Sequence, residues 1–185
     1  HGRLSPHLSA LVIIAHVKDG LELAREIHLP PVLSSVIAQH HGTSLASFMY
    51  QRARAEAEEG EEILESDFRY PGPKPQTREN AIIMLADTVE AAARAMTDHS
   101  PAKVAELVEQ LVAARIADGQ LDESPLTFAE ITEIKASFVK TLNGMFHQRL
   151  GYPPDAIRPA AGPAESAATP QTGAALADGN QLSQP

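Results

Sequence analysis

The chain has 185 residues and a formal net charge of −9 at pH 7, with no Cys or Trp and 4% aromatic residues. The acidic excess argues against a nucleic acid polymer as partner, and the absence of Cys excludes disulfides and thiolate metal sites. The apolar share is mostly Ala and Leu, which favours helices, and no stretch approaches the roughly 20 apolar residues of a membrane-spanning helix.

The first part of the chain predicts three helices separated by glycine and proline. Apolar residues recur at helical spacing over residues 5–26, with a serine able to cap the start and a proline tolerated in the first turn. A second helix is predicted over residues 30–40, where paired prolines begin it and Gly42 ends it. A third begins at Ser44 and becomes strongly acidic over residues 56–62, as expected for a solvated helix face or an insertion.

The second part predicts one loop and three further helices. Residues 67–75 hold three prolines in their last five positions, so they predict an extended loop rather than a helix or central strand. Helices are predicted over residues 77–96, 100–116 and 127–150, the last with apolar residues at spacings of three and four. The predicted fold class is therefore all-α.

Composition changes after residue 154. Residues 155–185 are mostly Ala, Pro, Gly, Ser, Thr and Gln, with almost nothing to bury, and predict a disordered tail. Residues 1–154 have the length of one domain. The chain begins with His1 rather than Met and shows no signal peptide, which indicates a segment of a longer protein.

His40 and His41 are adjacent at the predicted end of a helix. Consecutive helical residues point about 100° apart, so the pair could serve one site only because Gly42 lets the backbone turn directly afterwards. One core and one surface histidine is the alternative. His16 lies on an apolar helix, where it could be a metal ligand oriented by Asp19 or a core histidine with its own hydrogen bonds.

Asp87 follows the apolar run 82–86 and shares a helical row with Met84, away from any helix start. A buried carboxylate without a partner is costly, which leaves Arg94 and a metal ion as candidate partners. Glu90 pairs naturally with Arg94 four residues along a helix, and that would leave Asp87 for a metal.

Three histidines and one aspartate from separate helices, without cysteine, suit a divalent ion such as Mn, Fe, Zn or Mg. Two such ions bridged by a carboxylate would polarise a phosphodiester and activate water for in-line attack. That site needs more than four ligands, so the residues alone indicate a metal-dependent phosphohydrolase with an incomplete ligand set.

Several linear motifs are more specific than these spacings. They are LVIIAHVKDG at 11–20, QHHGT at 39–43, DFRYPGPKPQT at 67–77, IIMLAD at 82–87, DGQL at 118–121 and FHQR at 146–149. These motifs resemble the HD domain of the seven-transmembrane HD-domain (PgpH-like) family over about residues 1–154, and the proline-rich motif is the most distinctive.

The resemblance implies a bacterial cyclic-di-AMP phosphodiesterase, an enzyme that converts the cyclic dinucleotide to linear pApA. It implies a helical HD domain that holds two divalent ions, Mn or Fe, at the cytoplasmic face of the membrane, with the full-length protein embedded through an upstream region. Matched by motif, His16, His40 and His41 would surround one ion. Asp87 would serve the other, and Asp87 and His41 would be the catalytic residues.

The proline-rich motif contains two cations, Arg69 and Lys74. They are predicted to contact the phosphate or adenine of a cyclic dinucleotide. A salt bridge that braces the loop is the alternative.

The chain departs from the family at its start. The His-Asp dyad that gives the superfamily its name should lie upstream of this segment; the one histidine before the first helix is His1, and Gly2 follows it where an aspartate would be usual. We therefore expect this partial HD domain to be inactive alone. The alternatives are an HD domain that senses a nucleotide without cutting it and an HD phosphohydrolase for another nucleotide; retention of four metal-ligand residues disfavours the sensor.

Overall fold

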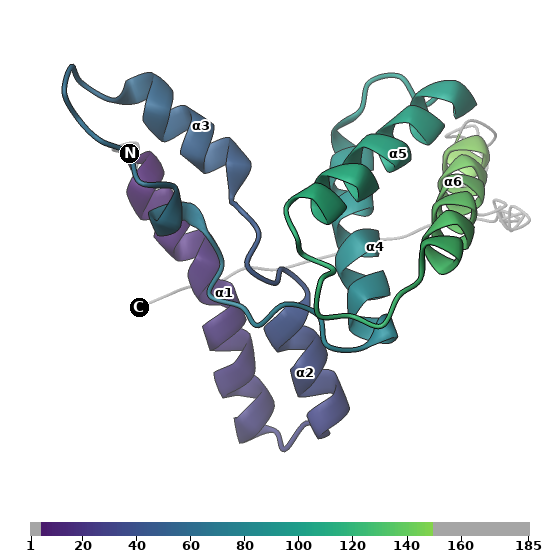
Figure 1. Ribbon diagram of the computed structural model, residues 1–185, viewed down its shortest axis with the longest axis horizontal. Helices are drawn as coiled ribbons and strands as arrows, with labels where there is room; N and C mark the ends of the chain where they lie inside the picture. The colour runs from purple at the N-terminus through teal and green to yellow at the C-terminus, as the bar shows by residue number, and fades with distance from the viewer. Residues whose placement is uncertain (1–4, 150–185) are drawn as a thin grey trace, which may run out of the picture. The chain divides into compact units, whose positions relative to one another are not determined.

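The computed structural model describes residues 5–149, which form six α-helices and one 3₁₀ helix (Figure 1). Its only strand-like pairing in this range is an isolated bridge between Leu45 and Arg69, so the all-α prediction is confirmed. None of the described helices is long and apolar enough to cross a membrane. The elements are α1 (Pro6–Glu26), α2 (Pro31–Gln39), α3 (Ser47–Glu56), η1 (Glu65–Phe68), α4 (Arg78–Ala95), α5 (Pro101–Ala117) and α6 (Phe128–Arg149).

Helices α4, α5 and α6 pack around one apolar core. Residues four apart lie on the same face of a helix, and α5 accordingly presents Val104, Val108 and Val112, each at most 1% exposed. Burying such a side chain contributes about 1.5–3 kcal/mol. The buried residues of this core are Leu85, Val89, Ala93, Val104, Val108, Val112, Ile131 and Leu142.

The amino-terminal elements are joined by a smaller core. Ala10 of α1, Ala53 of α3 and Phe68 of η1 form it. Helix α2 packs between α1 and α4, so it connects the two groups (Figure 1). A Cβ at Gly20 would lie 3.1 Å from Cγ2 of Ile37, so the glycine allows α1 and α2 to approach closely.

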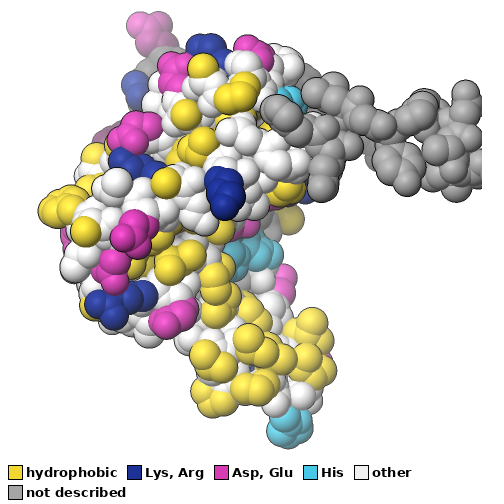
Figure 2. Space-filling model, turned by 90° about the vertical axis from the view of Figure 1, so that its right-hand side faces the viewer, with side chains coloured by type: hydrophobic (Ala, Val, Ile, Leu, Met, Phe, Trp, Pro, Cys, Tyr) yellow, Lys and Arg dark blue, Asp and Glu magenta, His cyan; other side chains and the backbone are white. Residues whose placement is uncertain are grey.

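One apolar face of α1 and α2 stays exposed. Figure 2 shows hydrophobic side chains gathered over the α1–α2 hairpin, beside a patch of histidines. A contiguous apolar patch is less common than single exposed apolar residues. The apolar residues of α1 therefore lie on an exposed face as well as on its buried face. The exposed residues are Leu8, Leu11, Val12, Ile13, Leu23, Ile27, Val32 and Leu33.

The predicted third helix is wrong at both ends. It begins at Ser47 rather than Ser44, because Ser44 is buried and its carbonyl accepts a hydrogen bond from the Tyr70 amide at 3.0 Å. It ends at Glu56, and residues 57–64 have no helix. Closely spaced acidic side chains on one helix repel one another, which accounts for that end.

The remaining predicted boundaries agree more closely. Residues 67–75 are extended from Arg69 on, but Asp67 and Phe68 belong to η1. The Thr77 side chain accepts a hydrogen bond from the Asn80 amide at 3.2 Å, which caps α4 as a helix start requires. The predicted tail, residues 155–185, lies outside the described residues.

Candidate metal centre

The imidazoles of His16, His40 and His41 meet where the end of α2 lies against α1. Each offers one ring nitrogen, and these nitrogens all lie within 4.8 Å of one another. Nitrogens bound to one ion at about 2.1 Å can be at most about 4.2 Å apart, so small ring rotations bring all three within reach of a single ion. Among the described residues this is the only such group of three or more metal-binding side chains.

Backbone carbonyls orient two of these rings. The Nδ1 atom of His16 contacts the carbonyl oxygen of Ile13, and that of His40 lies 2.8 Å from the carbonyl oxygen of Ile37. Because a carbonyl oxygen only accepts, these contacts are made by Nδ1–H groups, which leaves the Nε2 atom of each ring directed at the centre of the site. These Nε2 atoms lie 3.2 Å apart. A divalent ion beside these two atoms would take a lone pair from each ring, while Nδ1–H stays on its backbone carbonyl as it does in metal-binding histidines.

A tight turn lets the adjacent histidines face one place. Helix α2 ends at Gln39, and Gly42 then takes a φ of +54° in the left-handed region. The rings of His40 and His41 have centroids 4.0 Å apart, which consecutive residues within a continued helix would not achieve. The predicted turn at Gly42 is confirmed.

Two buried amides brace this turn from either side. Before it, Gln39 Oε1 accepts hydrogen bonds from Asn80 Nδ2 at 2.7 Å and from the Gln76 amide at 2.9 Å. After it, Gln120 Oε1 accepts from the Thr43 amide at 2.9 Å, and Gln120 Nε2 donates to Thr43 Oγ1 at 3.0 Å. Gln120 is fully buried. The histidine pair is therefore fixed to the start of α4 and to the α5–α6 connection.

His41 also contacts Tyr70 and Asp87. Its ring stacks on that of Tyr70 with centroids 4.3 Å apart, and its Nδ1 lies 3.7 Å from Oδ2 of Asp87. Burial first, and then the neighbouring imidazoles and Arg115, together lower the pKa of His41 to about 3. A neutral ring forms no ion pair, and 3.7 Å is too long for a hydrogen bond. His41 and Asp87 therefore both keep lone pairs for another ligand.

Asp87 is not buried, contrary to the expectation from its apolar surroundings. Its side chain is 45% exposed, because the buried face of α4 runs through Met84, Leu85 and Val89. Arg94 pairs with Glu90 at 3.0 Å, as predicted, and so does not neutralise Asp87.

One of the two alternatives for His16 is wrong. His16 is exposed rather than part of a core. Asp19 is exposed too, and the Ile13 carbonyl rather than Asp19 orients the His16 ring.

Comparison with known proteins matches residues 3–92 to the HD domain. The cyclic-di-AMP phosphodiesterase PgpH of Bacillus subtilis is 45% identical over 153 residues, which cover 83% of this chain and 21% of that protein. PgpH of Listeria monocytogenes is 43% identical over 155 residues, covering 84% and 21%. The crystal structure of the L. monocytogenes PgpH HD domain in complex with cyclic-di-AMP matches with a TM-score of 0.75 and 41% identity over 81% of this chain and 69% of that one.

This chain belongs to the HD-domain family. It spans about a fifth of the length of the curated relatives it matches, 21% in both cases. An HD domain implies divalent metal binding, and the facing Nε2 atoms of His16 and His40 fit that chemistry without a thiolate ligand.

The two cations of the proline-rich motif contact carboxylates of this domain. Arg69 lies 2.9 Å from Asp118 Oδ1 and also donates to the Thr43 carbonyl oxygen at 2.8 Å. The hydrogen bond that Arg69 donates to Asp118 raises the pKa of Arg69, although burial lowers it. Lys74 Nζ lies 3.8 Å from Asp122 Oδ2. These contacts correspond to the predicted loop brace, while contact with substrate stays a prediction.

A cleft opens beside the histidines of the HD domain. It has a volume of about 380 Å³ and is lined partly by His41, Tyr70, Asp87, Thr88 and Arg115. Sequence reasoning gave no role to Tyr70, Arg115, Gln39 or Gln120. The motifs contain all of these except Arg115, and a basic residue in the last turn of a helix is ordinary at the sequence level.

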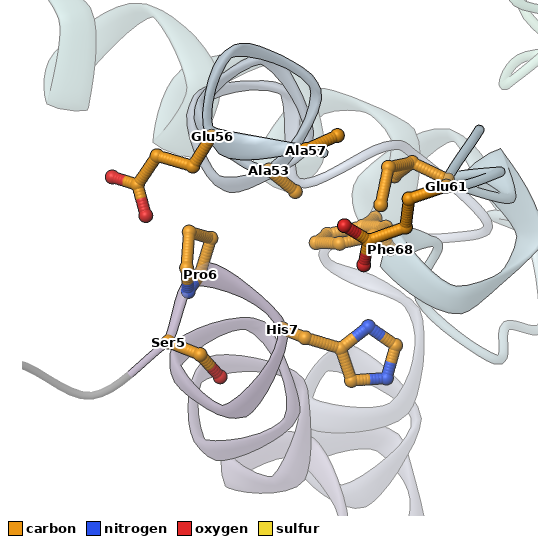
Figure 3. A pocket seen from close by; sticks show the side chains of 9 residues that line it. Ser5, Pro6, His7, Ala53, Glu56, Ala57, Glu61 and Phe68 are labelled. Atoms are coloured by element: carbon orange, nitrogen blue, oxygen red, sulfur yellow. The ribbon is translucent and has the colours of Figure 1, made fainter. Parts of the chain in front are cut away.

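A second pocket lies away from the three clustered histidines. Figure 3 shows it between the first turn of α1 and the end of α3, with His7, Glu56 and Glu61 around it. The described residues place no metal-binding cluster there, so the histidine cleft is the better candidate for a functional site.

Proposed function

We propose that the protein containing this chain is a metal-dependent phosphodiesterase that hydrolyses cyclic-di-AMP to pApA. The observation that carries the proposal is the pair of Nε2 atoms of His16 and His40, 3.2 Å apart and facing, in a domain 41% identical to one crystallised with cyclic-di-AMP. The names of the two PgpH relatives add the reaction class.

We assign the metal ligands as His16, His40, His41 and Asp87. The three imidazoles surround one divalent ion and Asp87 serves a second, with Mn or Fe as the metals. His41 suits this role because its pKa of about 3 leaves it neutral, so it loses no proton on binding a metal. Asp87 suits it because its carboxylate is exposed and unpaired by Arg94.

The chain's residues then divide the reaction between them. Divalent ions supply polarisation of the phosphoryl oxygen and activation of water. Asp87 and His41 are the catalytic residues: the Asp87 carboxylate and the His41 ring lie on the wall of the substrate cleft. Water adds to one phosphorus, the bond to the ribose 3′ oxygen breaks, and that oxygen takes up a proton to give linear pApA.

The proposed setting follows the same relatives. The full-length protein is embedded in the bacterial membrane through an upstream region, and this domain lies at its cytoplasmic face. This part of the proposal depends on the resemblance to the seven-transmembrane HD-domain family; the chain accounts for 21% of each PgpH relative, so the relatives have length for such a region.

The test uses protein of full natural length, loaded with Mn or Fe, and chromatographic detection of pApA from cyclic-di-AMP. Asp87→Asn and His16→Ala should each lower turnover by more than about 100-fold, since residues that merely orient metal ligands already cost about 10- to 100-fold. His28→Ala is the matched control, because His28 is an exposed histidine at the α1–α2 turn. Binding of cyclic-di-AMP by the wild type without any turnover would leave a sensor domain and refute the proposal.

A further inference from the structure

Arg115 is the only lysine or arginine among the residues that line the cleft beside His41. It lies in the last turn of α5 and its side chain is largely buried. A buried guanidinium is costly unless its charge and its N–H groups find partners.

The described residues provide Arg115 with few partners. Its Nε donates to Thr88 Oγ1 at 3.1 Å, and no carboxylate lies within ion-pair distance in the described part of the chain. The nearby Asp118 carboxylate is taken by Arg69 at 2.9 Å and by Gln120 Nε2 at 2.9 Å. The remaining N–H donors of the guanidinium therefore have no partner among the described residues, and they are available to a ligand in the cleft.

The contact with Thr88 also places the guanidinium. Thr88 directly follows Asp87 on α4, and both line the same cleft as Arg115. Holding Nε leaves the two terminal nitrogens of the guanidinium, whose planar fork matches a pair of phosphate oxygens. Burial lowers the pKa of Arg115 although Asp118, Asp87 and Tyr70 raise it, so an anion in the cleft would further stabilise its charge.

We propose that Arg115 is a substrate-binding residue whose guanidinium binds a phosphodiester oxygen of the nucleotide in this cleft. The inference rests on the proposed phosphodiesterase function. Arginine cannot release its proton in a protein, so its part is charge neutralisation and orientation rather than proton transfer. A cyclic dinucleotide carries two negative phosphodiester charges. Arg115 supplies one positive charge in addition to the charge of the metal ions that the proposed ligands bind.

The test compares Arg115→Gln and Arg115→Lys with the wild type in protein of full natural length. Loss of one charge-assisted hydrogen bond should lower kcat/KM for cyclic-di-AMP by about 10- to 100-fold in Arg115→Gln. Arg115→Lys keeps the charge but not the fork, so its loss should be smaller and mostly in KM. Arg94→Gln is the matched control, because that exposed arginine pairs with Glu90 away from the cleft.

A second readout separates this inference from the proposed function. Calorimetric titration of Mn-loaded protein with inorganic phosphate should show weaker binding in Arg115→Gln at unchanged bound Mn. If the wild type binds phosphate through Arg115 yet does not cut cyclic-di-AMP, the proposed function fails and the inference stands. The inference is overturned if Arg115→Lys and Arg115→Gln both fold and both keep the wild-type KM and the wild-type affinity for phosphate. If Arg115→Gln does not fold, Arg115→Lys decides: unchanged KM refutes binding through the fork.

Discussion

Replacing Gln120 with alanine tests whether a buried amide positions the histidine pair. The change removes the acceptor of the Thr43 amide and the donor to Thr43 Oγ1. Hydrogen bonds contribute about 0.5–1.5 kcal/mol each, and an amide left without a partner costs about 1–3 kcal/mol. We expect Gln120→Ala to lower the free energy of unfolding by about 3 kcal/mol.

Thermal unfolding of the metal-free protein measures this loss. At about 2–4 °C per kcal/mol for a domain of this size, Tm should fall by about 6–12 °C. Gln110→Ala is the matched control: Gln110 is an exposed residue of α5 whose amide contacts only Glu106 in the described structure, and its loss should stay within about 0.5 kcal/mol.

Metal affinity provides the decisive comparison. Because Thr43 lies two residues after His41, loosening this turn should weaken Mn binding by about 10-fold or more, as for other residues that orient ligands. A folded Gln120→Ala protein with wild-type Mn affinity would refute the positioning argument. Equal free energies of unfolding for Gln120→Ala and Gln110→Ala would refute the predicted loss of stability.

Two further predictions concern the same turn. In urea unfolding, Gly42→Ala should lower the free energy of unfolding by about 2 kcal/mol or more, because a Cβ there would lie 2.5 Å from Gln120 Oε1 and 2.7 Å from Met84 Cε. Gly60→Ala is the control: Gly60 also has a positive φ but open space around it, so that change should cost only backbone strain. The pKa of His41 is about 3 in the folded protein against 6.5 ordinarily, so between these values the unfolded chain binds a proton that the folded chain does not. Stability of the metal-free protein should therefore decrease as pH falls from 6.5 towards 3, and His41→Asn should flatten that decrease; parallel curves would contradict the pKa argument.

Local signals were sufficient for most helices and for three of the proposed ligands. Proline and serine at helix starts and glycine after α2 act within a few residues, so Ser5 and Gly42 could be interpreted without tertiary knowledge. The exposure of Asp87 could not, because apolar residues such as Ile82 and Ile83 cover more than one face of α4 and hide which face packs.

The braces of the site had no local signal at all. Gln120 acts on Thr43, 77 residues earlier, and nothing in the neighbourhood of either residue indicates that pairing. The proposed role of Arg115 likewise depends on tertiary structure, because it follows from the packing of α5 against α4. Buried polar groups of this kind are specified by partners distant in sequence, which periodicity cannot reveal.

The separation of these contacts along the chain also bears on the order of folding. His16 and His40 are 24 residues apart, within one helical hairpin, whereas Thr43 and Gln120 are 77 apart. Closing the longer loop costs about 1 kcal/mol more chain entropy, so the hairpin is the easier of the two to assemble first. A metal ion present during synthesis would then meet two imidazoles early and could act as a template on which the later helices dock.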